Sequence, residues 1–199
     1  MATNQEFLNF LRSEDADPDS VKAWVEENNF DINANINLER TALHWFAYWG
    51  NGRVVGILLE AGAKVEGLTA KGLDISEPSA LGAAIIFRDP SIVLMLLRAG
   101  ANPNMTNQLE YRDTNLHQAV EARDMPSMAE IINLMLIKGA DITARNFNGY
   151  TPFQLACLEG NIEAVRVIIN YYPHININEH GGISILEAFQ YSQPDLYAQ

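Results

Sequence analysis

Few side chains in this sequence have the type and spacing needed to bind a metal or react with a substrate. His174 and His180 stand six residues apart near the C-terminus, and Glu179 lies beside the second histidine. A zinc site needs three or four ligands at defined geometry, and only Glu179 is nearby. A metal-binding, small-molecule-binding or enzymatic segment at 174–180 is therefore an alternative interpretation of the chain, and we expect no metal and no cofactor.

The remaining reactive side chains form no catalytic pattern. The single cysteine, Cys157, lies among small and apolar residues, which is typical of a buried packing residue rather than a nucleophile. The sequence contains no phosphate-binding P-loop, dinucleotide fingerprint, zinc-protease helix or calcium loop. We therefore predict no catalytic residues and interpret the protein as a non-enzyme.

Composition and charge exclude further classes of function. The chain has 199 residues, of which 48% are hydrophobic and 19% are charged, as in globular proteins. Its 13 Lys and Arg against 25 Asp and Glu give a net charge of -12. Nucleic-acid phosphates and anionic membranes would repel such a chain, so we expect neither as a partner. The charge favours a protein partner that is basic or mixed in charge.

The cellular location is predicted from what the sequence lacks. Its apolar runs are far shorter than the roughly 20 residues that span a bilayer. The N-terminal residues show no basic segment leading into an apolar stretch, and the single cysteine fits a reducing compartment. These features predict a cytoplasmic protein.

A motif repeated five times organises the chain. Each copy begins with Thr or Ser, and successive copies are 38, 35, 37 and 33 residues apart. Such a period indicates a repeat architecture in which every copy folds as one small unit. The leading Thr is expected to cap the first helix of its unit with its side-chain hydroxyl. The five copies are Thr41-Ala-Leu-His44, Ser79-Ala-Leu-Gly82, Thr114-Asn-Leu-His117, Thr151-Pro-Phe-Gln154 and Ser184-Ile-Leu-Glu187.

A second landmark predicts another helix in each repeat. The glycines Gly62, Gly100 and Gly139 follow the first three motifs, and Tyr172-Pro173 takes their place in the fourth repeat. Each glycine is expected to end the second helix of its unit, where the chain can need a positive φ. Apolar residues recur eight, seven, five, four and three positions before each landmark, a spacing that indicates a helix buried on more than one side. The four sets are Val54, Val55, Ile57, Leu58 and Leu59; Ile92, Val93, Met95, Leu96 and Leu97; Ile131, Ile132, Leu134, Met135 and Leu136; and Ala164, Val165, Val167, Ile168 and Ile169.

The repeat resembles the ankyrin repeat, which has a period of about 33 residues and a Thr-Pro-Leu-His-x-Ala signature. The segment Thr151-Pro-Phe-Gln-Leu-Ala156 matches it most closely. The resemblance implies an all-α solenoid of stacked helix-turn-helix units with β-hairpin fingers, about four full units plus degenerate caps. It also implies that His44 and His117 are structural and bond between adjacent fingers.

We interpret the whole chain, residues 1–199, as a single ankyrin-repeat domain. Lys22 and Glu26 interrupt the apolar columns of the first unit, as expected for a cap whose outer face meets water. Stacking of open ends between chains is an alternative that this polar cap disfavours, so we expect a monomer. The predicted boundaries are 1–40 for the N-terminal cap, 41–78, 79–113, 114–150 and 151–183 for the repeats, and 184–199 for a truncated C-terminal cap.

The resemblance further implies a non-enzymatic protein-interaction module, acting as an adaptor, an inhibitor or a pathogen's effector in the host cytoplasm. Ankyrin proteins contact partners with the ends of their first helices and with their fingers. Tyr48 and Trp49 end one first helix, Ile86 and Phe87 end the next, and together they would form an apolar patch typical of an interface. Burial of this patch by the finger that follows is the alternative. Phe46 occupies the column that holds Ala84, Ala119 and Ala156 in the other repeats, and it is predicted to lie in the core.

Two departures from the regular period extend this prediction. The finger after Gly62 has 17 residues instead of 12 and predicts a hairpin turning near Lys71-Gly72, and the third repeat has about one extra helical turn near 124–127. Neutral drift is the alternative, because long loops are tolerated. The resemblance also implies Asn33 as a candidate site of asparagine hydroxylation. The alternative is that the side chain of Asn33 supports a turn. The predicted partner-binding residues are Arg40, Tyr48, Trp49, Lys71, Leu73, Ile86, Phe87, Tyr111, Arg112, Phe147 and Tyr150.

Overall fold

The computed structural model describes residues 2–37, 40–66, 79–106, 112–122 and 126–175. The chain divides into two compact units, unit 1 with residues 1–102 and unit 2 with residues 103–199. Helices dominate both units, and the predicted all-α class is confirmed. The predicted hairpin near Lys71-Gly72 and the C-terminal cap at 184–199 lie outside the described residues.

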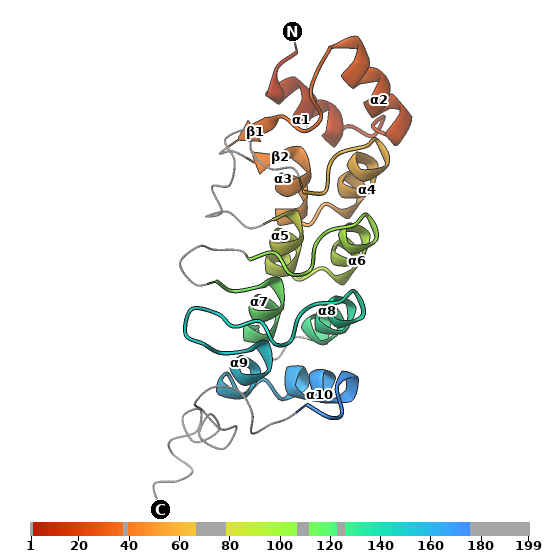
Figure 1. Cartoon of the computed structure of the whole chain (residues 1–199). Coiled ribbons are helices and arrows are strands. Elements are labelled where there is room, and N and C mark those ends of the chain that lie inside the picture. Colours follow the sequence, from red (N-terminus) through yellow and green to blue (C-terminus); the bar gives the residue numbers. More distant parts are fainter. Residues whose placement is uncertain (1, 38–39, 67–78, 107–111, 123–125, 176–199) are drawn as a thin grey trace, which may run out of the picture. The chain divides into compact units, whose positions relative to one another are not determined.

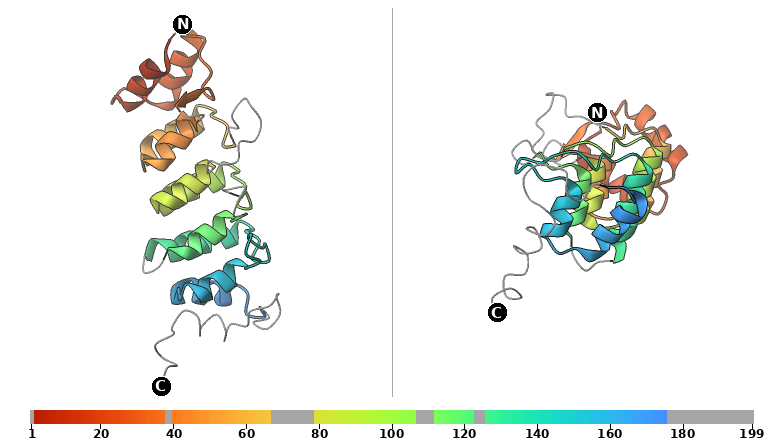
Figure 2. Two further views of the ribbon diagram at one scale, coloured as in Figure 1. Left: turned by 90° about the vertical axis from the view of Figure 1, so that its left-hand side faces the viewer. Right: turned by 60° about the horizontal axis from the view of Figure 1, so that its bottom comes forward.

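Unit 1 is built from pairs of antiparallel helices (Figure 1). The first helix of one pair packs on the first helix of the next, α3 on α5, and the second helices α2, α4 and α6 pack in succession (Figure 2). A short antiparallel pairing of β1 with β2 joins the first pair to the second. The elements are α1 (Asn4–Arg12), α2 (Pro18–Glu27), β1 (Asn35–Asn37), β2 (Arg40–Thr41), α3 (Ala42–Tyr48), α4 (Gly52–Glu60), α5 (Ala80–Phe87) and α6 (Pro90–Arg98).

Unit 2 repeats the same arrangement, with α7 packed on α9 and α8 packed on α10 (Figure 1). Its elements are α7 (Asn115–Glu121), α8 (Pro126–Ile137), α9 (Pro152–Leu158) and α10 (Ile162–Tyr171). Helix α8 has 12 residues, whereas α4 and α6 have nine each. The extra turn predicted near 124–127 therefore appears, within the described residues, as a longer start of α8.

Side-chain caps define where the first helices begin. The hydroxyl of the leading Thr or Ser accepts the backbone N–H three residues later, which satisfies a donor that the helix itself cannot pair. At the other end of the pair, Gly62, Gly100 and Gly139 have φ values of +95°, +97° and +84°, a conformation that favours glycine. Both predicted roles are confirmed. The capping residues are Thr41, Ser79, Thr114 and Thr151.

Four of the five predicted apolar positions are buried in each of α4, α6 and α8, whereas only two of the five are buried in α10. Val55, Val93 and Ile132 occupy one column and are all fully buried. In α10 the residues Ala164 and Ile168 are buried, whereas Ile169 is exposed. A full second face of α10 would need a neighbour beyond it, and the chain that follows, 176–199, lies outside the described residues.

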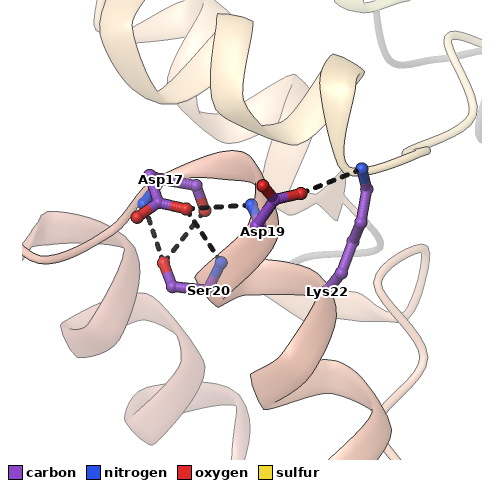
Figure 3. A network of polar contacts seen from close by, with 4 residues as sticks. All are labelled: Asp17, Asp19, Ser20 and Lys22. Atoms are coloured by element: carbon purple, nitrogen blue, oxygen red, sulfur yellow. Dashed lines mark hydrogen bonds and ion pairs between the residues drawn. The ribbon is translucent and has the colours of Figure 1, made fainter.

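The N-terminal helix pair has its own small core and its own caps. The ring of Phe7 stacks on Trp24 at 5.1 Å and packs on Phe30 at 4.6 Å between centroids. Asp17 and Ser20 form a reciprocal capping box at the start of α2, beside an exposed Asp19–Lys22 ion pair (Figure 3). Lys22 and Glu26 are exposed, as predicted for a capping unit.

One arginine connects this N-terminal pair to the next. The guanidinium of Arg53, at the start of α4, donates to the carbonyl oxygens of Ser13, Glu14 and Ala16 at 3.2, 3.1 and 2.7 Å. These carbonyls belong to the turn between α1 and α2. Hydrogen bonds from a charged donor are stronger than neutral ones, so Arg53 fastens this turn to α4.

A buried amide in unit 2 has no hydrogen-bond partner among the residues that the structure describes. Both polar side-chain atoms of Asn115, the first residue of α7, are buried without a partner in these ranges. The equivalent positions in the other repeats hold Ala42, Ala80 and Pro152. Burying an unpaired amide costs about 1–3 kcal/mol, so Asn115 is a local source of instability.

We expect replacement of Arg53 by alanine to lower the free energy of unfolding by about 1–2 kcal/mol, because three carbonyls lose their charged donor. Urea denaturation followed by circular dichroism measures this change. Arg98→Ala, which alters an exposed arginine at the end of α6, is the control and should change stability by less than about 0.5 kcal/mol. Equal effects of the two variants would contradict the fastening role.

We expect Asn115→Ala to raise the free energy of unfolding by about 1 kcal/mol, because alanine removes the unpaired amide and occurs at this position in two other repeats. Thermal denaturation of the purified chain measures the change. Gln118→Ala, in the same helix but half-exposed, is the control. A loss of stability in Asn115→Ala would show that the amide has a partner in solution.

Candidate functional site

Helix α3 presents two different faces. Its residues Leu43, Phe46 and Ala47 are buried at helical spacing, and Phe46 is only 3% exposed. The prediction that Phe46 belongs to the core is confirmed. Tyr48 is half-buried, and Trp49, which follows as the C-cap, is 60% exposed.

The exposed indole of Trp49 is held by neighbouring rings. It meets the ring of Trp45 edge-on, with 6.0 Å between the ring centroids. It also meets the ring of Tyr48, with 5.6 Å between the centroids and an angle of 89° between the planes of the Trp49 and Tyr48 rings. Edge-to-face pairs of this kind add about 0.5–1.5 kcal/mol beyond the area they bury. Trp49 is therefore exposed and still restrained on α3.

Helix α5 continues the exposed apolar surface. Its residues from Ala80 to Ile85 are buried, whereas the last two, Ile86 and Phe87, are 43% and 46% exposed. The Phe87 ring lies directly against Gly50, where an added Cβ would overlap it. Because Gly50 follows Trp49, this contact places Phe87 beside the end of α3. We call Tyr48, Trp49, Ile86 and Phe87 the aromatic surface of unit 1.

Two arginines stack on aromatic rings of α3. The guanidinium carbon of Arg40 lies 5.3 Å from the centre of the Tyr48 ring, and that of Arg12 lies 6.0 Å from the centre of the Phe46 ring. A third arginine, Arg88, is exposed directly after Phe87 and has a φ of +66°. Cations over ring faces gain about 0.5–1 kcal/mol at exposed sites. Positive charge therefore accompanies the aromatic residues.

The equivalent positions in unit 2 carry acidic side chains. Glu121 ends α7, and Glu159 follows the end of α9. Partial burial of the Glu121 carboxylate raises its pKa above the usual range, and the nearby carboxylates of Asp113 and Glu159 raise it further. This part of unit 2 therefore favours cationic rather than anionic contacts.

The predicted contacts in the fingers of unit 2 differ in exposure. Phe147 is 71% exposed, Arg112 is exposed with a φ of +53°, and Tyr150 is half-buried. Asn146 holds this finger by accepting the backbone N–H groups of Asn148 and Tyr150 at 3.1 and 3.0 Å. Three other predicted contacts, Lys71, Leu73 and Tyr111, lie outside the described residues.

His117 bonds to two segments at once. Its Nδ1 accepts the backbone N–H of Thr114 at 3.2 Å, so the ring proton resides on Nε2 and is donated to the Tyr150 carbonyl at 2.9 Å. The structural role predicted for His117 is confirmed. Burial lowers its pKa below the usual value, although Tyr150, Asp113 and Asp141 act in the opposite direction. Within the described residues, His44 repeats the local contact through Nδ1 and the Thr41 hydroxyl at 2.8 Å.

A set of bonds between neighbouring fingers was not predicted from the sequence. Asn29, Gly62 and Gly100 each stand two residues after the end of a second helix, α2, α4 or α6. The side chain four residues after each of them accepts the backbone N–H two residues after the next landmark glycine. Distances are 2.8 Å for Asn33 to Lys64, 2.8 Å for Glu66 to Asn102 and 2.7 Å for Asn104 to Asp141. The constant offset from the landmarks was the signal that could have revealed them. The side chain of Asn33 therefore has a structural contact with the next finger, which differs from the turn-supporting role given as the alternative to hydroxylation.

The described side chains that were considered for catalysis or metal binding do not form a common site. Cys157 is 4% exposed, and burial raises the pKa of its thiol to about 11, which disfavours the nucleophilic thiolate. In the described ranges, no three His, Cys, Asp or Glu side chains gather in a way that could hold a metal. His174 is exposed, and Glu179 and His180 lie outside these ranges. No described helix has the length and apolar character needed to cross a membrane.

Comparison with protein families agrees with the geometry. The family described as ankyrin repeats in three copies matches residues 9–107, 81–179 and 116–196. The chain belongs to the ankyrin repeat family. The predicted ankyrin-repeat fold is thus confirmed, and ankyrin repeats are protein-interaction modules that are typically non-catalytic.

Several curated proteins are similar to parts of this ankyrin-repeat chain. Protein lin-12 of Caenorhabditis elegans is 32% identical over 119 residues, 58% of this chain and 8% of the relative. NF-kappa-B inhibitor alpha of Gallus gallus is 30% identical over 116 residues, 56% and 33% of the two chains. The nuclear factor NF-kappa-B p105 subunit of Gallus gallus is 27% identical over 164 residues, which cover 77% of this chain and 16% of the relative. The chain spans a third or less of the length of these relatives.

We expect stability to fall as the pH drops below about 6.5, the usual pKa of an unfolded histidine. The lowered pKa of His117 means that the unfolded chain takes up a proton that the folded protein excludes, so acid favours unfolding. His117→Gln should reduce the loss between pH 7.5 and 5.5, measured by urea denaturation at each pH. Gln154 already fills this position in the next repeat and accepts the Thr151 N–H at 3.0 Å. An unchanged pH dependence in His117→Gln would contradict this assignment.

Proposed function

We propose that this protein binds a partner protein through the aromatic surface of unit 1. The observation that carries the proposal is the exposure of Trp49, Ile86 and Phe87 side by side, on helices that bury every other large apolar side chain at least in part. Burying one such side chain fully is worth about 1.5–3 kcal/mol. A partner that covers all three would therefore gain several kilocalories per mole.

The construction of the surface favours binding because little of it must be ordered. Helices α3 and α5 begin at the caps Thr41 and Ser79 and pack on one another. Ring contacts restrain Trp49, and Gly50 supports the ring of Phe87. A surface held in this way loses little conformational entropy on binding, which leaves more of the contact energy as affinity.

The role of such binding is that of a stand-alone adaptor, inhibitor or effector. Similarity to NF-kappa-B inhibitor alpha supports an inhibitor, and the ankyrin family supports protein binding in general. We further propose a monomeric cytoplasmic protein without enzymatic activity, made of one domain with the repeat boundaries expected above from the motifs. Arg112, Phe147 and Tyr150 would supply partner contacts in unit 2, and Lys71, Leu73 and Tyr111 remain predicted contacts.

We expect Trp49→Ala with Phe87→Ala to weaken binding of the partner at least tenfold, because two exposed anchors are lost. Proteins captured from a lysate by the tagged chain are identified by mass spectrometry, purified and titrated calorimetrically against each variant. Tyr48 is left intact because it is half-buried.

The matched control is Ile137→Ala, which removes a 56% exposed apolar side chain at the end of α8. It should change the affinity less than twofold, and all variants should keep the melting temperature of the parent chain. An affinity that is unaltered in the double variant would refute the proposed surface.

A further inference from the structure

We infer that Asn148, in a finger of unit 2, is a site of spontaneous modification, at which water converts asparagine to aspartate and isoaspartate. Asn148 is followed by Gly149, and the sequence has one other Asn-Gly step, Asn51-Gly52. Asparagine cyclises most easily before glycine, because a residue without a Cβ leaves its backbone nitrogen accessible to the preceding side chain. The structure restrains the side chain of Asn51 and leaves that of Asn148 exposed, so the same dipeptide has two different reactivities.

The reaction needs water and no other reagent. The backbone nitrogen of Gly149 loses its proton to the solvent and bonds to Cγ of Asn148. The bond from Cγ to Nδ2 then breaks, and the amide nitrogen takes a proton from the solvent and leaves as ammonia. Water opens the resulting cyclic imide at one of its two carbonyl carbons and returns a proton to the nitrogen of Gly149. Opening at Cγ gives aspartate, whereas opening at the main-chain carbonyl gives isoaspartate, and nothing is oxidised or reduced.

The surroundings of Asn148 leave its side chain free to rotate. The residue is exposed, and its backbone N–H donates to Asn146 Oδ1 at 3.1 Å. The side-chain amide of Asn148 makes no hydrogen bond to another described residue. The position of a Cβ on Gly149 is also open, because no atom of the described chain beyond the two adjacent residues lies within 4 Å of it. Rotation of the amide toward the nitrogen of Gly149 therefore breaks no described contact.

One hydrogen bond restrains the attacking nitrogen. The N–H of Gly149 donates to the carbonyl oxygen of Asn146 at 2.9 Å and must be released before the ring can form. Gly149 has a φ of +80°, and glycine changes its backbone angles with little steric resistance. Local opening of a short exposed turn needs much less free energy than unfolding of the core. This hydrogen bond therefore slows the reaction without preventing it.

Asn51 provides a comparison within the same chain. Its Oδ1 accepts the backbone N–H of Val54 at 3.1 Å, so its side chain caps α4. Gly52 is the first residue of that helix, and a Cβ on it would lie 3.5 Å from the side chain of Ile92 in α6. Cyclisation at Asn51 would remove the cap and distort a packed helix turn, which costs stability. Asn148 has no such cost.

Conversion would change the finger that carries Phe147. Isoaspartate adds one carbon atom to the backbone inside the turn where Asn146 Oδ1 accepts the N–H groups of Asn148 and Tyr150. Both products also place a carboxylate next to Phe147, which is 71% exposed. The effect of this charge on partner binding rests on the proposed function, whereas the conversion itself does not.

The test incubates the purified full chain in mildly alkaline buffer prepared with heavy-oxygen water, and follows its peptides by mass spectrometry. We expect the Asn148 peptide to lose ammonia and gain heavy oxygen at least tenfold faster than the Asn51 peptide. Isoaspartate should exceed aspartate, and electron-transfer fragmentation distinguishes the two. Asn148→Gln is the matched control, because its longer amide would have to form a larger ring, and this position should stay unconverted over the same period.

The unfolded chain separates the effect of structure from that of neighbouring residues in the sequence. In concentrated guanidinium chloride the two asparagines should convert at rates within about threefold of each other, because the cap and the packing around Asn51 are lost. Equal rates in the folded protein, faster conversion of Asn51 or no conversion at either position would overturn the inference. A tenfold preference for Asn148 that persists in the unfolded chain would also overturn it, because the flanking sequence would then explain the selectivity.

Discussion

The helix pairs that contain α4 and α6 cannot bury their apolar side chains alone, and this constraint explains most of the described structure. The columns of α4 and α6 are apolar on more than one side, and Val55 and Val93 reach full burial only because helix pairs pack in succession. Helix α5 is the extreme case, since the residues from Ala80 to Ile85 are all buried. Contact with the adjacent pair, rather than helix propensity, therefore stabilises each unit.

The same packing also requires hydrogen-bond partners for backbone polar groups between neighbouring units. Side chains at fixed positions in the repeat supply these partners. Asn33, Glu66 and Asn104 each accept a backbone N–H of the following finger. Asn161 caps α10 and also donates its side-chain amide to the Val120 carbonyl at 2.8 Å. Such bonds orient neighbouring fingers and helix pairs, so the exposed residues between them are held at defined places.

Side-by-side packing covers the flanks of the helices and leaves their ends open. The residues at these ends are less buried than the helix interiors, so their chemistry can differ between repeats that share one core. In unit 1 the ends present Trp49 and Phe87 with arginines nearby. In unit 2 the equivalent positions present Glu121 and Glu159, whose mutual repulsion contributes to the raised pKa of Glu121. Partner selection in the proposed function thus resides in residues that the fold itself does not need.

The sequence alone determined the repeats, the capping residues, the core position of Phe46 and the structural role of His117, because each depends on spacing within a repeat or on a motif. The degree of exposure was decided by the tertiary structure. Trp49 is exposed and its neighbour Tyr48 half-buried, because burial depends on residues distant in the chain. The contact of Phe87 with Gly50 and the stacking of Arg40 on Tyr48 likewise join residues whose spacing follows no repeat rule. Local periodicity specifies which face of a helix is apolar, and only the neighbouring helices decide which part of that face still meets water.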